Sequence, residues 1–398
     1  MKINVKSDKV FVMKIKNNKR KICFVITAGN HYSRSKLILR ALQSHRAVDL
    51  QLVVGASALL PNYGDVLSEL AGDGFVCHAK IVMTLEGGNL VAMAKTAGIG
   101  ITEFATVFDN LKPDIVVVRG DRYEVLSAAV AAAYLNIPIA HIEGGDVTGT
   151  IDESVRHAVT KLAHIHFPTN EQSRRRIIRM GENPRYVFNV GCPGLEFIAK
   201  NNYVVSNELV NRLGVGDIVD INKPYLVVMQ HSVTSEVGLN GRNVKETLLA
   251  VAKLNIPAIW FWPNVDAGTD EISKEIRVFR EHQHSKDIRF LKYLPTEQFV
   301  GLLKKCSCLI GNSSVGIKES SWLGVPVVNI GTRQQGRMKA DNVITVSYDR
   351  KKIASAARKQ IARGPYKRSG IYFKKNTSQR IVDILSSIEL YVQKKFHA

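Results

Sequence analysis

Short apolar runs rich in β-branched residues alternate with longer amphipathic segments, and this alternation constrains the fold of the chain more than any other feature. It is typical of β-α-β units, in which helices connect strands that pair in parallel. The alternation pauses at the polar stretch over residues 201–223 and then resumes. Since 398 residues exceed one ordinary core, the sequence predicts two α/β domains in series.

The expected elements follow from this pattern. The predicted strands of the first half are at residues 21–27, 50–55, 115–119, 138–143, 164–168 and 186–190, with helices at 91–111 and 123–135. The predicted strands of the second half are at residues 225–230, 257–262, 287–293, 308–311, 326–330 and 343–346. We therefore expect a basic N-terminal extension (1–20), an N-terminal Rossmann-like domain (21–200), a C-terminal Rossmann-like nucleotide-binding domain (201–375) and a C-terminal helical segment (376–398) that packs back across the domains.

The charge balance is strongly basic, with 55 Lys and Arg against 35 Asp and Glu, a formal net charge of +20. The excess gathers in the first 21 residues and between residues 350 and 375. No recognised nucleic-acid motif and no basic stripe interleaved with aromatic residues accompanies it, so we expect no nucleic-acid partner. An anionic substrate accounts for part of the positive charge.

The apolar runs and the cysteines indicate a compartment. No stretch approaches the roughly 20 continuous apolar residues of a membrane span, and the basic N-terminus lacks the features of a secretory signal. The five cysteines are scattered and have neither zinc-site nor redox spacing. We therefore expect a cytoplasmic protein with reduced thiols and no membrane partner.

Polar residues follow the predicted strand at 115–119, in the order Gly120, Asp121 and Arg122. The glycine permits a tight turn and a close approach of a ligand to the backbone. An acid between arginines at the carboxyl end of a strand suits a base or a phosphate clamp, and ligands of such sheets bind at these ends. A salt bridge that merely orders the turn is the alternative.

A denser polar cluster spans residues 141–157 and contains Glu143, Asp146, Asp152 and Glu153. It follows a predicted strand and opens a predicted helix, with Thr150 or Asp152 near the N-cap. Capping explains two of the carboxylates, and the others suit general acid–base chemistry. A metal site is the alternative, although hard cations prefer more regularly spaced oxygen ligands.

Three loops of the second half complete the candidate site. Residues 311–319 place Ser313 and Ser314 between a strand and a helix, which favours phosphate binding, with Glu319 positioned to accept hydrogen bonds from ribose hydroxyls. His231 follows the strand at 225–230, and Arg333 follows the strand at 326–330 where an arginine suits a diphosphate. Ordinary strand–helix turns, a structural histidine and a solvated loop are the alternatives.

Together these segments resemble the hydrolysing UDP-N-acetylglucosamine 2-epimerases, the type that serves sialic and other nonulosonic acid synthesis. The resemblance covers residues 21–388, and its most specific piece is HIEGGDVTGTIDESVRHAVTKLAH at 141–164. GDR at 120–122, NVDAGT at 264–269, GNSSVGIKE at 311–319 and GTRQQGR at 331–337 also carry it. The non-hydrolysing 2-epimerases are similar in fold but lack the central segment.

The resemblance implies a GT-B fold with the active site in the interdomain cleft. It implies removal of the C2 proton, expulsion of the nucleoside diphosphate and hydration of the resulting glycal to the free 2-epimer, without metal or NAD. Homo-oligomers, dimers or tetramers, are usual in the family. By position, the catalytic group comprises Asp121, Asp146, Glu153, Asp152 and His231, and the substrate-binding group comprises Arg122, Arg34, Ser313, Ser314, Glu319 and Arg333.

Two positions depart from the family pattern. Asp146 stands where the family commonly has Glu, and the loop at 27–36 lacks an equivalent of the family's Arg-Ala-Asp-Tyr segment, with Arg34 as the only candidate for its arginine. Because this loop faces the sugar, a 2,4-diacetamido substrate of the legionaminic acid type is one expectation. A GT-B glycosyltransferase that uses a nucleotide-sugar donor and a non-catalytic nucleotide-sugar sensor are the rival classes.

Overall fold

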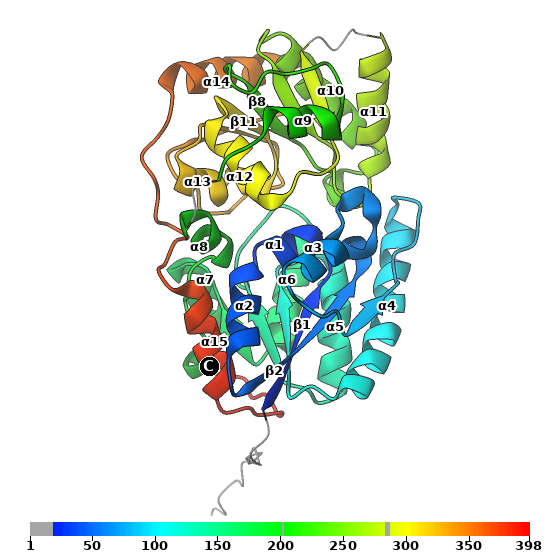
Figure 1. Ribbon diagram of the computed structural model, residues 1–398, viewed down its shortest axis with the longest axis vertical. Coiled ribbons are helices and arrows are strands. Elements are labelled where there is room, and N and C mark those ends of the chain that lie inside the picture. The colour runs from blue at the N-terminus through cyan, green and yellow to red at the C-terminus, as the bar shows by residue number, and fades with distance from the viewer. Residues whose placement is uncertain (1–18, 201–202, 283–286) are drawn as a thin grey trace, which may run out of the picture.

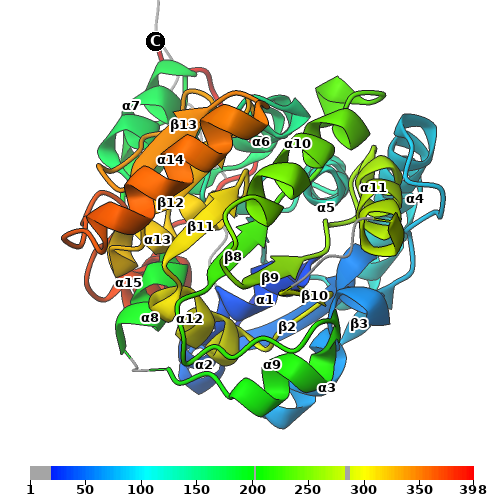
Figure 2. The same ribbon diagram turned by 90° about the horizontal axis from the view of Figure 1, so that it is seen from above.

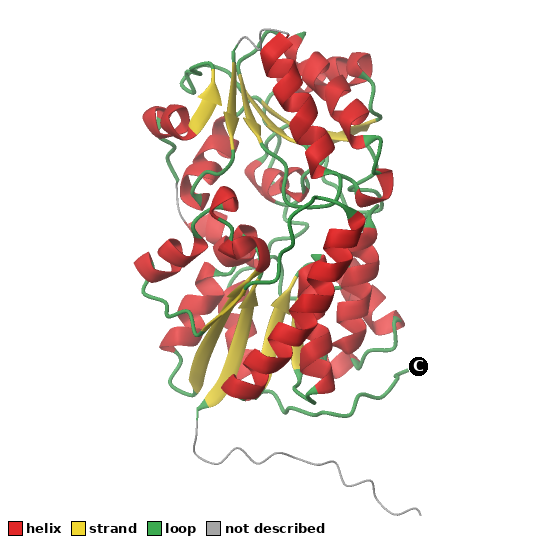
Figure 3. Cartoon of the chain, turned by 90° about the vertical axis from the view of Figure 1, so that its right-hand side faces the viewer, coloured by secondary structure: helices red, strands yellow, loops and turns green. Residues whose placement is uncertain are grey.

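The computed structural model describes residues 19–200, 203–282 and 287–398. These residues form two α/β domains, drawn one above the other in Figure 1 with the first domain below. Each domain holds a mostly parallel sheet between helices, as Figure 3 shows. The prediction of two Rossmann-like domains is therefore confirmed. The predicted basic extension falls outside the described residues except for its last two positions.

The sheet of the first domain has the strand order β3-β2-β1-β4-β5-β6, and all of its pairs are parallel. This is the order of the dinucleotide-binding fold, which reverses direction next to β1 and opens a crevice at the carboxyl ends of the strands. Its strands are β1 (Arg20–Ile26), β2 (Val48–Gly55), β3 (Ala79–Ile81), β4 (Ile115–Arg119), β5 (Ile139–Ile142) and β6 (Ile165–Phe167).

The sheet of the second domain has the order β13-β12-β11-β8-β9-β10-β7, with only the edge strand β7 antiparallel. Figure 2 looks down on this domain and shows the sheet between α10, α11 and α14 on one side and α9, α12 and α13 on the other. Its strands are β7 (Gly214–Gly216), β8 (Leu226–Met229), β9 (Ala258–Phe261), β10 (Ile288–Leu291), β11 (Cys308–Gly311), β12 (Val327–Ile330) and β13 (Val343–Val346).

The α-helices connect and cover these strands. Those of the first half are α1 (Gly29–Ser33), α2 (Lys36–Ser44), α3 (Val66–Gly72), α4 (Leu90–Leu111), α5 (Tyr123–Tyr134), α6 (Ile151–Leu162), α7 (Glu171–Arg179) and α8 (Pro193–Lys200). Those of the second half are α9 (Asn207–Leu213), α10 (Asn240–Ala252), α11 (Thr269–His282), α12 (Thr296–Lys305), α13 (Glu319–Leu323), α14 (Arg350–Arg363) and α15 (Thr377–Ser387).

Three details differ from the predicted elements. Residues 186–190 form no strand, because the chain leaves a short 3-10 turn there and makes only one bridge, from Val187 to His166. The short strands β3 and β7 were not predicted, since neither has an apolar run long enough to stand out in the sequence. The predicted C-terminal helical segment at 376–398 is helical only over Thr377–Ser387. The predicted domain boundaries themselves stay a prediction.

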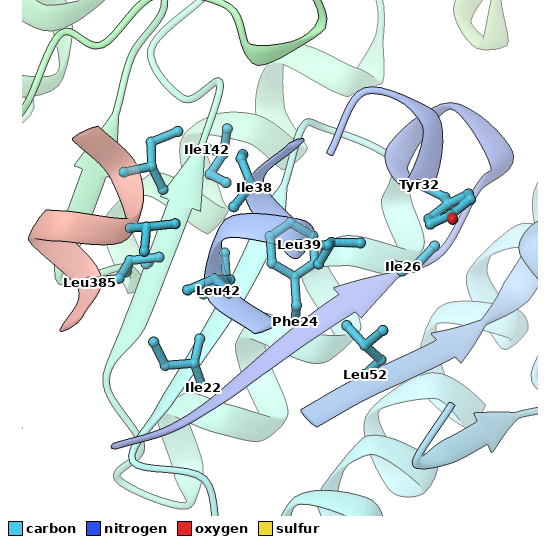
Figure 4. Packing of buried hydrophobic residues seen from close by; sticks show 14 of the residues in the cluster. Ile22, Phe24, Ile26, Tyr32, Ile38, Leu39, Leu42, Leu52, Ile142 and Leu385 are labelled. Atoms are coloured by element: carbon cyan, nitrogen blue, oxygen red, sulfur yellow. The ribbon is translucent and has the colours of Figure 1, made fainter. Parts of the chain in front are cut away.

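The last helix, α15, completes the core of the first domain. Its residues Ile381, Val382 and Leu385 are buried in the same cluster as Ile22 and Phe24 of β1, and Figure 4 shows Leu385 facing this cluster. Figure 1 shows α15 alongside α2, with which it is in contact. The chain thus returns from the second domain to finish the first.

Helix α4 is the one helix among the described residues that is long and apolar enough, by length and composition, to cross a membrane. Only 17% of its most apolar window is buried. Its inner face, with Phe104 and Phe108, packs into the core of the first domain. Its outer face exposes Leu90, Val91 and Ile99.

Replacing Leu385 by Ala should lower the free energy of unfolding by about 2–5 kcal/mol, because it removes buried methyl groups and leaves a cavity. Urea denaturation measures the change. The matched control is Arg380→Ala on the exposed side of the same helix, which should stay within about 0.5 kcal/mol of the parent. Equal losses in the two variants would contradict the role assigned to α15.

Candidate active site

A cleft lies between the two domains at the carboxyl ends of their strands, where the rule for open parallel sheets places ligands. It is lined by residues from the loops that follow the strands of both sheets. These include Arg34 after β1, Arg122 after β4, His231 after β8, Asn264 after β9, Tyr293 after β10, Ser313, Ser314 and Glu319 after β11, and Arg333 after β12.

The two predicted groups of residues occupy different places. The whole predicted substrate-binding group lines the cleft: Arg34, Arg122, Ser313, Ser314, Glu319 and Arg333. His231, predicted as catalytic, lines it too. The predicted catalytic carboxylates are not among the lining residues: Asp121, Asp146, Asp152 and Glu153. The first three pair with arginines beside the cleft, and Glu153 lies 3.9 Å from His157, whose pKa is lowered by burial.

The start of α6 brings two of these carboxylates to the boundary between the domains. Thr150 is the N-cap, and Glu153 accepts a hydrogen bond from the backbone N–H of Thr148 at 2.6 Å. Just before the helix, the N–H of Gly149 donates to the carbonyl of Arg333 at 3.2 Å. A Cβ on Gly149 would lie 2.2 Å from the carbonyl oxygen of Thr332, so only glycine permits this approach. The start of α6 therefore packs directly against the loop that carries Arg333.

Asp152 lies beside a cleft residue and has an unusual pKa. Its carboxylate is 3.8 Å from the guanidinium of Arg333. Burial, followed by repulsion from Asp121, raises the pKa of Asp152 to about 6. A carboxyl group with a pKa near the working pH is suited to proton transfer.

Asp121 and Asp146 are instead held in their ionised forms. Burial opposes ionisation, but Arg156 and Arg337 outweigh it and lower the pKa of Asp121. Asp121 pairs with Arg156, and Arg337 lies 2.9 Å from the carboxylate of Asp146. The pKa of Asp146 is also lowered despite its burial, by Arg337 and Lys318. Since Arg337 and Lys318 come from the second domain, these pairs join the two halves of the molecule.

Glu143 forms the deepest part of this network. Its carboxylate lies 3.3 Å from Arg119 and 3.3 Å from the ammonium group of Lys318. The backbone of Glu143 has φ = 68°, a left-handed conformation that is uncommon outside glycine. Burial again opposes ionisation, and Arg119, Lys318 and Arg34 together lower the pKa of Glu143 well below its usual range.

Sequence reasoning did not single out the partners of these carboxylates. Arg156, Lys318 and Arg337 all lie in the segments that carried the family resemblance. Lys318 is next to Glu319, and Arg337 closes the segment that contains Arg333. Their position in those segments was the available signal, but the pairing across the domains is visible only in the structure.

His231 is a neutral, firmly positioned side chain. Its Nδ1 accepts a hydrogen bond from the backbone N–H of Asn264 at 3.3 Å, and its backbone exchanges two bonds of 2.8 Å with the side chain of Asn312. Burial, followed by the charge of Arg333, lowers the pKa of His231 to about 3. At neutral pH this imidazole therefore carries no charge.

Two further pairs cross the cleft. Arg34 from the first domain pairs with Glu319 from the second. Arg122 lies 2.6 Å from Glu124 and 3.1 Å from Asp266 of the second domain. Both arginines are largely buried. Among the described residues no group of three or more His, Cys, Asp and Glu side chains is placed to hold a metal ion.

Comparison with known proteins identifies the family. The sequence model of UDP-N-acetylglucosamine 2-epimerase matches residues 40–386. The UDP-N,N'-diacetylbacillosamine 2-epimerase (hydrolyzing) of Legionella pneumophila is 34% identical over 374 residues, 94% of this chain and 97% of that protein. The UDP-N-acetylglucosamine 2-epimerase of Neisseria meningitidis is 29% identical over 95% of this chain and 98% of its own.

Solved structures agree on the fold. The UDP-GlcNAc 2-epimerase from Neisseria meningitidis bound to UDP-GlcNAc superposes with a TM-score of 0.74 at 17% identity, covering 92% of this chain and 99% of that one. The enzyme from Methanocaldococcus jannaschii in complex with UDP-GlcNAc and UDP gives 0.74 at 19% identity, with the same coverage. The expected GT-B fold is confirmed, and the chain belongs to the UDP-N-acetylglucosamine 2-epimerase family of enzymes.

Proposed function

We propose that this enzyme is a hydrolysing 2-epimerase of a UDP-linked 2-acetamido sugar, which it releases as the free 2-epimer. The observation that carries the proposal is the contact between Asp152 and Arg333. It places a carboxyl group with a pKa near 6 next to a cation that lines the cleft. A residue suited to bind the diphosphate, Arg333, thus lies next to a residue suited to transfer a proton, Asp152.

Substrate binding is assigned to the residues that line the cleft. Arg122 and Arg333 neutralise the diphosphate, and Ser313 and Ser314 donate hydrogen bonds to it. Glu319 accepts hydrogen bonds from the ribose hydroxyls. Since Glu319 also pairs with Arg34, it must either bind both partners at once or release Arg34 when the ribose binds. His231, uncharged at neutral pH, offers a hydrogen bond near the phosphates without adding charge.

The chemical step begins with removal of the C2 proton by Asp152, the base in this proposal. The electron pair of that bond forms the C1–C2 double bond, and the C1–O bond breaks to expel the nucleoside diphosphate toward the arginines. Water then adds across the glycal, its hydroxyl bonding to C1 and a proton returning to C2 from the opposite face. Asp121 and Asp146 remain ionised and hold Arg156 and Arg337, while Glu153 orients the start of α6.

The first loop supports a proposal for the sugar. Residues 29–34 form α1 and its C-cap, and Gly29, Asn30, Ser33 and Arg34 line the cleft. We assign a 2,4-diacetamido sugar of the bacillosamine type, because this loop departs from the UDP-GlcNAc pattern and the Legionella relative is named for that substrate. The product would then feed nonulosonic acid synthesis of the sialic or legionaminic type. The comparisons do not favour the glycosyltransferase alternative.

Partners and compartment are part of the same proposal. The exposed apolar residues of α4, Leu90, Val91 and Ile99, suit contact with a second copy of the chain in a homo-oligomer. We assign a cytoplasmic location, where nucleotide-sugars are made, and neither a nucleic-acid nor a membrane partner. The proposed mechanism needs neither a metal nor NAD.

The pH profile tests the base. Asp152 loses its proton as the pH rises through about 6, so kcat/KM should fall below that pH and level off above it. Asp152→Asn should lower turnover by at least about 100-fold and remove this acid limb. The control, Asp109→Asn on the exposed face of α4, should keep the turnover of the parent enzyme and the acid limb of its pH profile. A profile in which Asp152→Asn retains the limb would assign it to another group.

Glu319→Ala should raise KM by about tenfold or more while changing kcat far less, because it removes bonds that are equal in ground and transition states. Steady-state kinetics measure both constants. Glu319→Gln, which keeps an accepting oxygen, should recover part of the loss, and Glu208→Ala on the exposed face of α9 is the charge control. An unchanged KM in Glu319→Ala would refute the ribose contact.

Isotope labelling tests the reaction itself. In heavy water the released sugar should carry deuterium at C2 with inverted configuration, because the returned hydrogen comes from solvent. In water labelled with oxygen-18 the label should appear on the free sugar and not on the nucleoside diphosphate. Mass spectrometry and NMR read both results. Retained protium at C2 would rule out the epimerase mechanism and leave a simple hydrolase.

A further inference from the structure

An open groove lies at the free edge of the second sheet, between β13 and α14. Its volume is about 710 Å³. The strand and the residue that follows it form one wall, and α14 forms the other. Figure 2 shows α14 alongside β12 and β13 at this edge, and α14 is in contact with both strands. None of the residues that line the groove lines the substrate cleft, so the groove is a separate feature of the surface.

The strand β13 is paired on one side only. It runs parallel to β12, and no strand of the described residues pairs with its other side. The carbonyls of Asn342 and Val346 accept hydrogen bonds from the N–H groups of Val327 and Gly331. Because successive residues of a strand direct their backbone groups to opposite sides, Thr345 directs its N–H and C=O away from the sheet. Thr345 is exposed, so its backbone is accessible to an added strand.

The wall formed by α14 carries positive charge. Lys352 and Lys359 lie two turns apart on one face of the helix, with Ser355 between them, and Lys351 lies next to this face. All three lysines are exposed. Within the described part of the chain none of them forms an ion pair. The groove therefore combines a free strand edge with cations that have no partner.

Two carboxylates that flank the start of α14 already have partners. Asp349 caps the helix by accepting a hydrogen bond of 2.8 Å from the backbone N–H of Lys352. Glu246 pairs with Arg350 at 2.6 Å. Residues 350–382 contain no Asp or Glu, although Lys and Arg recur throughout them. The positive charge of the groove is therefore uncompensated locally and attracts an anionic partner.

The groove favours an acidic peptide over other anionic partners. An extended peptide can bond to the backbone of β13, which neither a nucleic acid nor a bilayer can do. Among the described residues no aromatic side chain lines the groove for a base to stack on. The large apolar side chains that the described chain exposes lie elsewhere, so none is available here to insert into a membrane.

We propose that this groove docks an extended acidic segment of a partner protein, which adds to the second sheet as a strand beside β13. The backbone of that segment bonds to Thr345. Its carboxylates alternate along the strand, so those on the side of α14 pair with Lys352 and Lys359. Lysines next to a free edge also discourage unwanted pairing. The same charges therefore repel a second copy of this basic chain and select an acidic segment.

Fluorescence anisotropy with a fluorescein-labelled peptide of alternating Glu and Thr tests the role of the lysines. The full chain should bind the peptide, and Lys352→Glu combined with Lys359→Glu should weaken binding by about tenfold or more. The matched control reverses two exposed lysines elsewhere in the second domain, Lys245→Glu on α10 with Lys274→Glu on α11. Because of screening by salt, the control should weaken binding by less than about threefold. No binding to the parent, or equal losses in the two double variants, would overturn the proposal.

Hydrogen exchange tests the addition of a strand. With the peptide bound, the backbone amide of Thr345 should exchange at least about fivefold more slowly, because its N–H donates to the added strand. Unchanged exchange in the complex would reduce the contact to charge alone and overturn the docked strand.

The anisotropy titration is then repeated with a labelled oligothymidylate and with vesicles of phosphatidylglycerol. The peptide should bind more tightly than either. Tighter binding of the oligonucleotide or the vesicles, lost in the Lys352→Glu and Lys359→Glu double variant, would overturn the assignment to a peptide. None of these readouts uses turnover, so they stand apart from the test of the epimerase reaction.

Discussion

The ion pairs between Arg337 and Lys318 of the second domain and Asp146 and Glu143 of the first are the constraint on which the rest of the site depends. All four side chains are buried. A buried charge without a partner is costly, so burying these carboxylates and cations where the domains meet requires that they pair across the boundary. The domains therefore complete each other electrostatically. Arg337 also lies 3.8 Å from Asp121, so the pKa values of the carboxylates beside the cleft depend on the contact between the domains.

This arrangement separates the two roles that carboxylates play in the site. Asp121 and Asp146 have arginine partners at short range and stay ionised, whereas the guanidinium of Arg333 is 3.8 Å from Asp152 and does not outweigh burial and the negative charge of Asp121. The negative charge of Asp121 is one reason why Asp152 holds its proton to a higher pH. The ionised carboxylate of Asp121 thus raises the pKa of Asp152. In other enzymes, too, different surroundings separate the pKa values of two neighbouring acids.

Much of the fold was predictable because parallel strands buried on both faces give apolar runs, as β4 and β11 do at the predicted residues. The strands β3 and β7 were not predicted because their conformation is set by pairing to a neighbouring strand and not by their own residues. Ser313 and Arg333 could be predicted to lie at the cleft because each comes shortly after a strand, and Glu319 because it opens the helix after β11. The pairing of Arg34 with Glu319, and of Arg337 with Asp146, joins segments that are remote in sequence, so no local pattern encodes it.

The return of α15 to the first domain has a consequence for synthesis of the chain. The first sheet is complete once Phe167 has left the ribosome, but its cluster with Ile22 and Phe24 still lacks Ile381, Val382 and Leu385. Until translation ends, the part of this cluster that α15 covers is open to water or to a chaperone. The second domain, whose sheet ends at Val346, is made in the meantime. The domain translated first is therefore the one whose folding must wait for the last helix.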